Sequence, residues 1–167
     1  MERIVSLQKL SLENFEPWSH GDNYGGAEWP LAEKWGAQAL GFHLETLDPG
    51  KFSCPYHRHE GEEELFIALQ GSCVLRQDGN FRRVQTGDLI FFPTGVCHQF
   101  FNPGPEPFVF FALSNRNKAD VCEYPDSHKR IERNPRRITQ DGKEIDDYWA
   151  GEENPSSFWP EEWLKPG

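Results

Sequence analysis

Cysteine pairs and long apolar runs are the first things missing from this sequence. Its 167 residues include only 4 cysteines, with no C-x-x-C pair and no disulfide-dense spacing. No apolar run approaches the roughly 20 residues that span a membrane. The opening MERIVSLQKL lacks the apolar centre of a signal peptide. We therefore predict a reduced, cytoplasmic protein with no membrane partner.

Positive charge is also in short supply. Lys and Arg number 17 against 27 Asp and Glu, which gives a net charge of −10. Such a balance disfavours nucleic acid as a partner of the whole molecule. One local exception is a basic run made of Lys129, Arg130, Arg133, Arg136 and Arg137. We interpret it as a solvated strip that balances nearby acids; the alternative is an anchor for an anionic partner or substrate.

Helical periodicity is absent from the central part of the chain, whereas turn residues are plentiful. The 15 Gly and 13 Pro suit an all-β fold. Between residues 37 and 113, short strands recur at the roughly 8–12 residue spacing of a sandwich or barrel. The expected strands are 37–47, 52–59, 64–70, 72–77, 81–84, 89–92, 97–101 and 108–113. Asp78-Gly79 is the strongest hairpin signal among them.

The domain prediction is a single unit over residues 1–167, with a barrel core at about 37–113. Residues 1–36 are expected to form an irregular arm with a short strand at 4–7, and residues 114–167 a C-terminal extension. A disordered tail would be poor in aromatic residues, but this one contains Tyr148, Trp149, Phe158, Trp159 and Trp163. We therefore expect the extension to dock on the barrel or on a second protomer, and we predict a homodimer.

The stretch between residues 50 and 102 carries residue types that bind metals. His57 and His59 are two residues apart, so they share one face if they lie on a strand. Glu64 begins the next expected strand, and His98 belongs to a later one. Three imidazoles and one carboxylate are good ligands for first-row transition metals.

Two blocks of this stretch resemble the paired motifs of the cupin superfamily. The first motif is matched, with one extra residue after its glycine, by Gly50, His57, His59, Glu64 and Gly71. The second is matched in full by Gly87, Pro93, Gly95, His98 and Asn102. Two spaced motifs together are a strong signal, whereas a lone H-x-H would be weak.

The resemblance implies a small jelly roll, or double-stranded β-helix, that holds one metal inside the barrel. The ligands it implies are His57, His59, Glu64 and His98. Such a set leaves one or two coordination positions open for water or substrate, as catalytic sites do. Glu63 is the main rival to Glu64. The competing interpretation is that these histidines are ordinary core or surface residues.

Other residues are candidates for the wall of the site. Phe66, Ala68 and Phe100 share parity with the ligands or lie on expected inner strands. His43 alternates with large apolar side chains, so it faces either a polar cavity or solvent, and we favour solvent. Cys54 and Cys97 are close to the ligands in sequence, and we interpret both as packing residues.

The reaction is left open among three classes, since one fold hosts many chemistries. The ligands suit iron, manganese, nickel, cobalt, copper or zinc. With the metal as a Lewis acid, the protein is a sugar-phosphate isomerase or epimerase acting on a small polar or anionic molecule. Residues 121–129 resemble a segment of small bacterial cupins likened to such isomerases, and the adjacent basic run would suit a phosphate. The alternatives are an iron dioxygenase or manganese decarboxylase, and a non-catalytic binding or sensing module.

The sequence offers no dedicated general base beyond the expected ligands. The titratable candidates near the motifs or in the C-terminal extension are His43, Glu123, Tyr124 and His128. Each has a surface location as its simpler interpretation.

Overall fold

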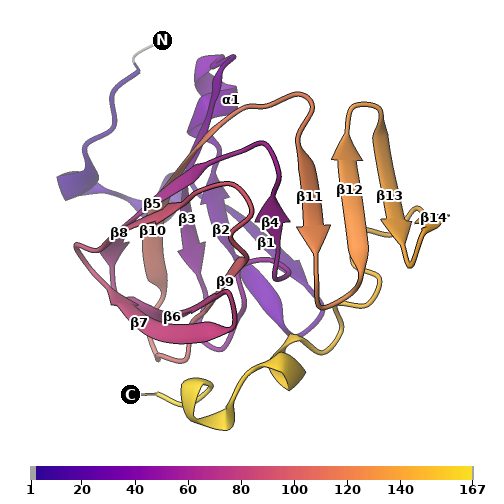
Figure 1. Cartoon of the computed structure of the whole chain (residues 1–167). Coiled ribbons are helices and arrows are strands. Elements are labelled where there is room, and N and C mark those ends of the chain that lie inside the picture. The colour runs from indigo at the N-terminus through magenta and orange to yellow at the C-terminus, as the bar shows by residue number, and fades with distance from the viewer. Residues whose placement is uncertain (1–2, 167) are drawn as a thin grey trace.

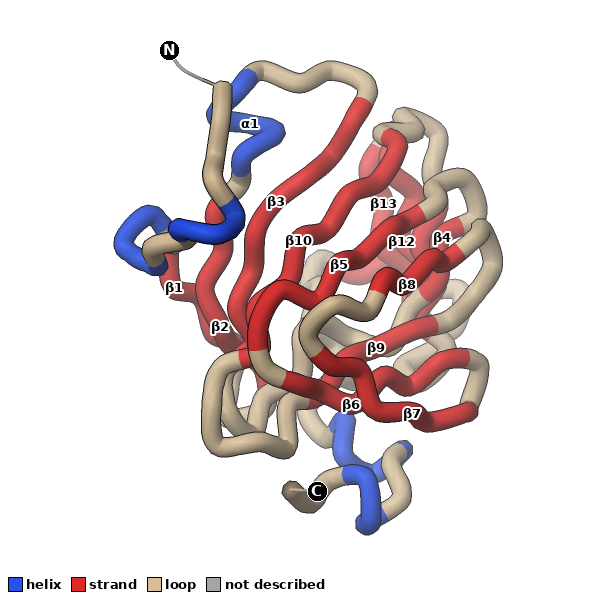
Figure 2. The backbone as a smooth tube through the Cα atoms, turned by 90° about the vertical axis from the view of Figure 1, so that its left-hand side faces the viewer, coloured by secondary structure: helices blue, strands red, loops and turns tan. Residues whose placement is uncertain are grey.

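Antiparallel strands make up most of the structure, a computed structural model that describes residues 3–166. A six-stranded sheet has the order β1-β2-β3-β10-β5-β8 and a three-stranded sheet the order β7-β6-β9. The six strands span Glu16–His20, Tyr24–Trp29, Leu40–Leu47, Phe108–Asn115, Glu64–Gln70 and Leu89–Phe92. The three strands span Asn80–Gln85, Ser72–Gln77 and His98–Phe101. Figures 1 and 2 show the two sheets curving around a common interior.

A third sheet extends this pair on one side, with the order β14-β13-β12-β11-β4 (Figure 1). Its strands span Lys143–Ile145, Arg136–Gln140, Lys129–Arg133, Val121–Tyr124 and Arg58–His59. The helical elements are α1 (Leu31–Trp35) and the 3-10 turns η1 (Leu7–Lys9), η2 (Leu12–Asn14), η3 (Pro155–Phe158) and η4 (Glu161–Trp163). Among the described residues, no helix is both long enough and apolar enough to cross a membrane.

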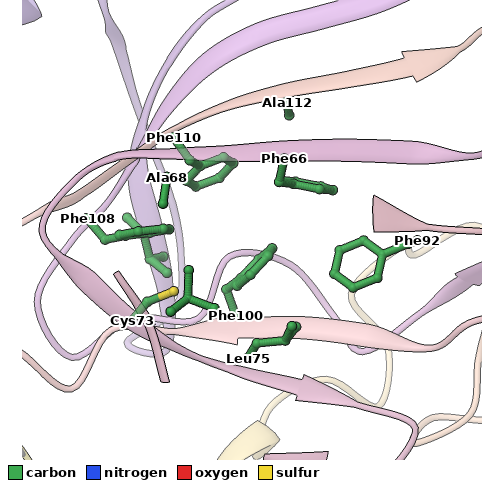
Figure 3. Close-up of a cluster of buried hydrophobic side chains, with 11 residues drawn as sticks. Phe66, Ala68, Cys73, Leu75, Phe92, Phe100, Phe108, Phe110 and Ala112 are labelled. Carbon is green, nitrogen blue, oxygen red and sulfur yellow. The ribbon is translucent and has the colours of Figure 1, made fainter. Parts of the chain in front are cut away.

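Aromatic side chains fill the space between the six-stranded and three-stranded sheets. Alternate residues of a strand point to the same face, so β10 sends Phe108 and Phe110 inward beside Phe66 of β5. Phe100 of β9 meets them from the other sheet, as Figure 3 shows. Each fully buried side chain of this size contributes roughly 1.5–3 kcal/mol. This packing confirms the predicted all-β jelly roll.

Several expected strands are confirmed, and the hairpin at residues 78–79 is one of the clearest. Asp78 and Gly79 have φ of 47° and 75°, as a type I′ turn between β6 and β7 requires. The expected strand over residues 52–59 is mostly wrong. Only Arg58–His59 forms a strand there, with single bridges at Phe52 and His57. Pro55 cannot donate to a ladder, which accounts for the interruption.

The irregular N-terminal arm is a wrong prediction. Residues 4–6 form no strand, but β1 and β2 make a hairpin that adds to the six-stranded sheet beside β3. The pairing depends on Gly26, because a Cβ there would lie 1.9 Å from the Thr46 carbonyl oxygen. Glycine therefore permits the close approach of β2 and β3 at this position.

The C-terminal extension also contains more regular structure than predicted, since β11 to β14 follow β10. Its last part packs on the barrel, where Trp159 is buried against Phe52 and Phe101. The Trp159 indole N–H donates to Gln99 Oε1 at 3.0 Å. Trp159 thus finds its partners within its own chain, and the homodimer stays a prediction.

Candidate metal centre

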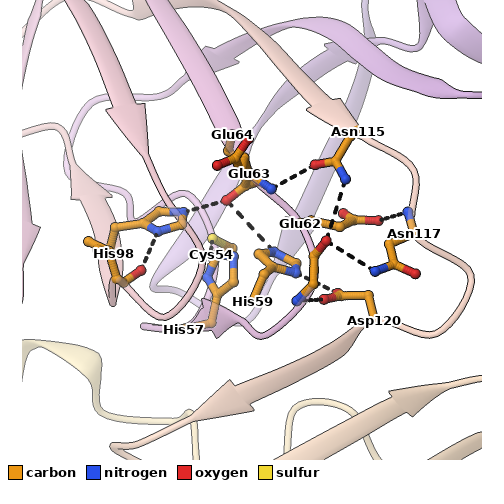
Figure 4. Close-up of polar contacts among 12 residues, drawn as sticks. Cys54, His57, His59, Glu62, Glu63, Glu64, His98, Asn115, Asn117 and Asp120 are labelled. Atoms are coloured by element: carbon orange, nitrogen blue, oxygen red, sulfur yellow. Dashed lines mark hydrogen bonds and ion pairs between the residues drawn. The ribbon is translucent and has the colours of Figure 1, made fainter.

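Two backbone contacts bring the motif histidines together at one end of the barrel. His57 and His98 form an isolated bridge in which each backbone N–H donates to the other's carbonyl, at 3.2 and 2.8 Å. Their rings lie 4.5 Å apart between centroids. His59 follows on β4, and Glu64 is the first residue of β5. Figure 4 shows the four side chains converging from these elements.

The carboxylate of Glu64 lies among the imidazoles. Its Oε2 is 3.0 Å from His98 Nε2 and 3.7 Å from His59 Nε2. Ligand atoms of His57, Glu64 and His98 all lie within 4.8 Å of one another. Glu63, the rival, is exposed, and its backbone N–H donates to Asn115 Oδ1 (Figure 4). The structure therefore places Glu64, and not Glu63, beside the histidines.

Each of the three imidazoles has its Nδ1 beside an oxygen acceptor. His57 Nδ1 is 2.9 Å from the Pro55 carbonyl, and His98 Nδ1 is 3.3 Å from the Val96 carbonyl. His59 Nδ1 is 2.7 Å from Asp120 Oδ2. A proton on Nδ1 satisfies each contact and leaves the Nε2 lone pair free.

The pKa shifts of Glu64 and His98 favour the protonation states that bind a cation. Burial opposes ionisation of Glu64, but the surrounding imidazoles, His98 first, outweigh it and lower the pKa of Glu64 to about 2. Burial and the neighbouring His57 lower the pKa of His98, which favours its neutral form. A carboxylate and neutral imidazoles are the forms that bind metal.

Two buried atoms of the cluster have no hydrogen bond. They are Glu64 Oε2 and His98 Nε2, which point at each other without an aligned N–H between them. Unpaired buried acceptors are costly, and a divalent cation held between them would remove that cost. The residues present thus fit a transition metal.

Asp120 belongs to this site, and sequence reasoning missed it. Its side chain is 1% exposed; besides His59, it accepts the Gly61 backbone N–H at 2.9 Å. It directly precedes β11, a strand of the third sheet, and it is far along the chain from His59. No spacing rule links two such positions, so the sequence carries no local signal for the pair. Asp120 positions His59 and fixes its tautomer.

Replacing Asp120 with asparagine is expected to weaken metal binding by about 10–100-fold, the usual effect of losing a carboxylate that orients a histidine ligand. The asparagine oxygen can still accept the Gly61 N–H, so folding should be retained. Calorimetric titration of the metal-free protein with Zn²⁺ or Mn²⁺ measures the affinity, and circular dichroism checks the fold. Unchanged affinity would show that His59 does not depend on Asp120.

A cavity of about 320 Å³ opens next to the candidate ligands His57, Glu64 and His98. Of the expected wall residues, His43, Phe66 and Phe100 line it, while Ala68 is buried in the aromatic core and does not. The structure thus places His43 on the cavity wall, where its side chain is 32% exposed. Phe42 and Leu44 lie on the opposite face of β3 from His43. The N-terminal segment covers that face.

Much of the cavity wall comes from segments outside the predicted barrel core. β1 and β2 supply Trp18 and Glu28. Tyr148 and Trp149, which follow β14, close another side. Their rings meet edge to face at 4.9 Å, and Trp149 stacks on His20 at 4.1 Å. The two arms are therefore part of the site.

Cys54 also lines the cavity, with its Sγ 3.5 Å from His57 Nδ1. Burial raises the pKa of the Cys54 thiol to about 12, so this group is neutral near pH 7. Cys97 lies away from the cavity and next to Tyr56. Cys122, which sequence reasoning did not consider, has its Sγ close to His57 and His59.

His43 lies between two carboxylates on the cavity wall. Its Nε2 is 3.2 Å from Glu45 Oε2, and its Nδ1 is 3.9 Å from Glu28 Oε1. Burial opposes protonation of His43, but the hydrogen bond and charge of Glu45, aided by Glu28, outweigh it and raise its pKa. Burial also raises the pKa of Glu28. The raised pKa favours a proton on His43, and an imidazole in this position can both accept and donate one.

The other titratable candidates do not line the cavity. Tyr124 lies behind His57 with its ring 5.8 Å away, and burial raises the pKa of its hydroxyl. Glu123 is paired with Arg58 at 2.5 Å, and His128 is exposed beside Asp141. Of the four candidates, only His43 faces the cavity.

The basic run lies on β12 and β13 and does not reach the cavity either. Arg130 pairs with Glu60 and Glu123, as expected for a strip that balances nearby acids. Lys129 is different, because its side chain is fully buried and pairs with Glu152 at 2.8 Å. None of the five residues lines the cavity, so the run does not supply a phosphate anchor there.

Residues 43–114 match the family model described as a cupin domain. This region of the chain is a cupin domain. A solved structure of a candidate sugar phosphate isomerase from Acidithiobacillus ferrooxidans superposes with a TM-score of 0.74. It is 27% identical, and the alignment covers 87% of this chain and 97% of that one.

Two curated relatives share shorter regions with this chain. An auxin-binding protein of Prunus persica is 32% identical over 46% of this chain and 39% of its own length. An oxalate-binding protein of Thermotoga maritima is 34% identical over 43% of this chain and 59% of its own length. The match thus spans less than two thirds of either relative, and their names describe ligands of those proteins.

Proposed function

We propose that this cupin is a metal-dependent enzyme that moves a proton on a small hydroxy-carbonyl compound, as isomerases and epimerases do. The observation that carries the proposal is one cavity lined both by candidate metal ligands and by the His43–Glu45 pair. His43 pairs with Ala112, and Ala112 pairs with Phe66 two residues beyond Glu64. This register leaves about 10–12 Å between the backbones of His43 and Glu64, enough for a small substrate between the side chains.

The metal would be held by His57, His59, Glu64 and His98. When bound, it supplies Lewis acidity toward a carbonyl or hydroxyl oxygen. Iron, manganese, nickel, cobalt, copper and zinc all suit this donor set. The similarity to the A. ferrooxidans protein, a candidate sugar phosphate isomerase, supports the choice of an isomerase reaction.

His43 is the proposed acid and base. With its Nε2–H donated to Glu45, Nδ1 is the atom left to accept a proton from the substrate carbon. The carboxylates of Glu45 and Glu28 stabilise the imidazolium that forms. The same Nδ1 can then return the proton to the neighbouring carbon. The rings of Trp18, Tyr148 and Trp149 limit water at the cavity, which strengthens these interactions.

Replacing His43 with glutamine is expected to lower turnover by about 10²–10⁴-fold, the usual contribution of a positioned acid or base. Metal content should not change, because His43 is separate from the proposed ligands. The measurement is deuterium incorporation from D₂O into a panel of aldoses and ketoses, followed by NMR without oxygen. EDTA-treated protein is the control for metal dependence. Full exchange in the variant would remove His43 from the reaction.

A matched variant, Glu45→Gln, tests the role of the carboxylate. Losing the charge of Glu45 lowers the pKa of His43, so the acidic limb of the kcat/KM profile should move to lower pH. A purely structural role would lower activity without moving that limb.

Oxygen uptake dependent on ferrous iron, in place of exchange, would favour a dioxygenase. Ligand binding without any product would favour a binding module.

A further inference from the structure

The charged side chains that line the cavity are all of one sign. They are the carboxylates of Glu28, Glu45 and Glu64, and no lysine or arginine within residues 3–166 lines it. A single divalent cation at the histidines would not neutralise three carboxylates. His57 and His98 line the same cavity, so a ligand that enters it lies between the candidate metal ligands and these carboxylates.

Basic side chains on the surrounding elements already have partners. Lys129, which lies behind Tyr148, is enclosed and paired with Glu152. Arg116, at the end of the neighbouring strand β10, pairs with Glu33. Lys34 of α1 pairs with Glu16. Among residues 3–166, no Lys or Arg lines the cavity, whereas proteins ordinarily bind phosphate through Arg, Lys or backbone N–H groups.

The remaining wall chemistry suits hydroxyl groups and C–H faces. Carboxylates such as Glu28 and Glu45 accept hydrogen bonds from hydroxyls. Aromatic faces of Trp18 and Trp149 pack against the apolar faces of a small ring or chain. A cationic ligand would be repelled by a dication at the histidine cluster.

We infer that the ligand of this cavity is an uncharged polyhydroxylated carbonyl compound, an unphosphorylated sugar and not a sugar phosphate. The inference rests on the proposed function for the reaction, but it concerns charge recognition and can be tested by binding alone. Glu28 and Glu45 are the residues that exclude the phosphate, by repulsion of like charges in a partly dehydrated site.

The test is calorimetric titration of the metal-loaded protein with matched pairs: mannose and mannose 6-phosphate, fructose and fructose 6-phosphate, ribose and ribose 5-phosphate. In the pair that binds best, the uncharged member should bind at least about tenfold more tightly, as repulsion of this kind gives. Tighter binding of the phosphorylated member overturns the inference. So does the absence of binding by every sugar at tens of millimolar.

A charge-reversal variant, Glu28→Lys, sharpens the test. Glu28→Lys should make the phosphorylated sugar the tighter-binding member of the pair. The isosteric variant Glu28→Gln should only reduce the ratio between the two affinities. Unchanged preference in a folded Glu28→Lys protein would also count against the inference. If the phosphorylated sugar binds more tightly and also exchanges deuterium, the inference about charge is wrong but the proposed reaction is retained. Binding of an uncharged sugar without exchange would reject the reaction and keep the ligand class.

Discussion

Replacing His57 and His98 together with alanine is expected to abolish metal retention. The two residues supply half of the proposed ligands. Because Nδ1 of each ring contacts a backbone carbonyl, Nε2 is the atom left to bind the metal. Loss of a residue that only orients a ligand costs about 10–100-fold in affinity, so loss of two ligands should cost well over 100-fold. Elemental analysis of protein purified without added metal measures the retained content.

Two further variants make that result interpretable. His128→Ala removes an imidazole that is exposed beside Asp141, and it should retain the metal content of the parent protein. Because His98 stacks on Phe92 at 3.9 Å, its loss can disturb packing. Glu64→Gln keeps the side-chain shape and removes one charged ligand, so it should lose metal with the fold intact. Undiminished metal in the double alanine variant would refute the site.

The candidate ligands were predictable because their signal is local. His57 and His59 alternate on one short segment, and Glu64 begins the strand that follows the next turn. His98 belongs to a second block with its own turn residues. What the sequence could not give was the geometry that turns their Nε2 atoms inward. It depends on carbonyl groups and on Asp120, whose positions are set by the fold.

The strands of the barrel were predictable for a similar reason, whereas those of the arms were not. Residues 64–77 alternate or run apolar between clear breakers, and β5 and β6 form there. β12 and β13 read KRIER and RRITQ, with one inward apolar residue each, Ile131 and Ile138. Their strand character depends on pairing with neighbours, which a single-sequence pattern does not contain.

The cavity illustrates the same limit. Glu28 and Trp149 are far apart in the chain, yet they line one space with His43. Parity placed His43 opposite Leu44, but the choice between cavity and solvent depended on which face of β3 the N-terminal segment covers. The structure shows that it covers the face of Leu44. The arms therefore form part of the cavity wall, although the family motifs lie outside them.

Replacing Lys129 with methionine is expected to destabilise the protein by about 3–5 kcal/mol, because it leaves the buried Glu152 carboxylate without its partner. The Lys129 side chain is 0% exposed, and Glu152 is 5% exposed. Lys129 Nζ also donates to the Tyr148 carbonyl at 2.5 Å. The pair thus ties the cavity-wall segment to β12. At roughly 2–4 °C per kcal/mol for a chain of this size, thermal unfolding should shift by about 10 °C.

The matched controls separate an unpaired buried charge from lost packing. In Lys129→Met/Glu152→Gln, the remaining side chain is uncharged and can still contact Ser127, which donates to Glu152 at 2.5 Å in the parent protein. Most of the stability should return, since the cost lies in the isolated carboxylate. Lys165→Met breaks the exposed pair with Glu161, and it should change stability by less than about 1 kcal/mol. Equal losses in the single and double variants would contradict the charge argument and assign the effect to packing around Tyr124 and Tyr148.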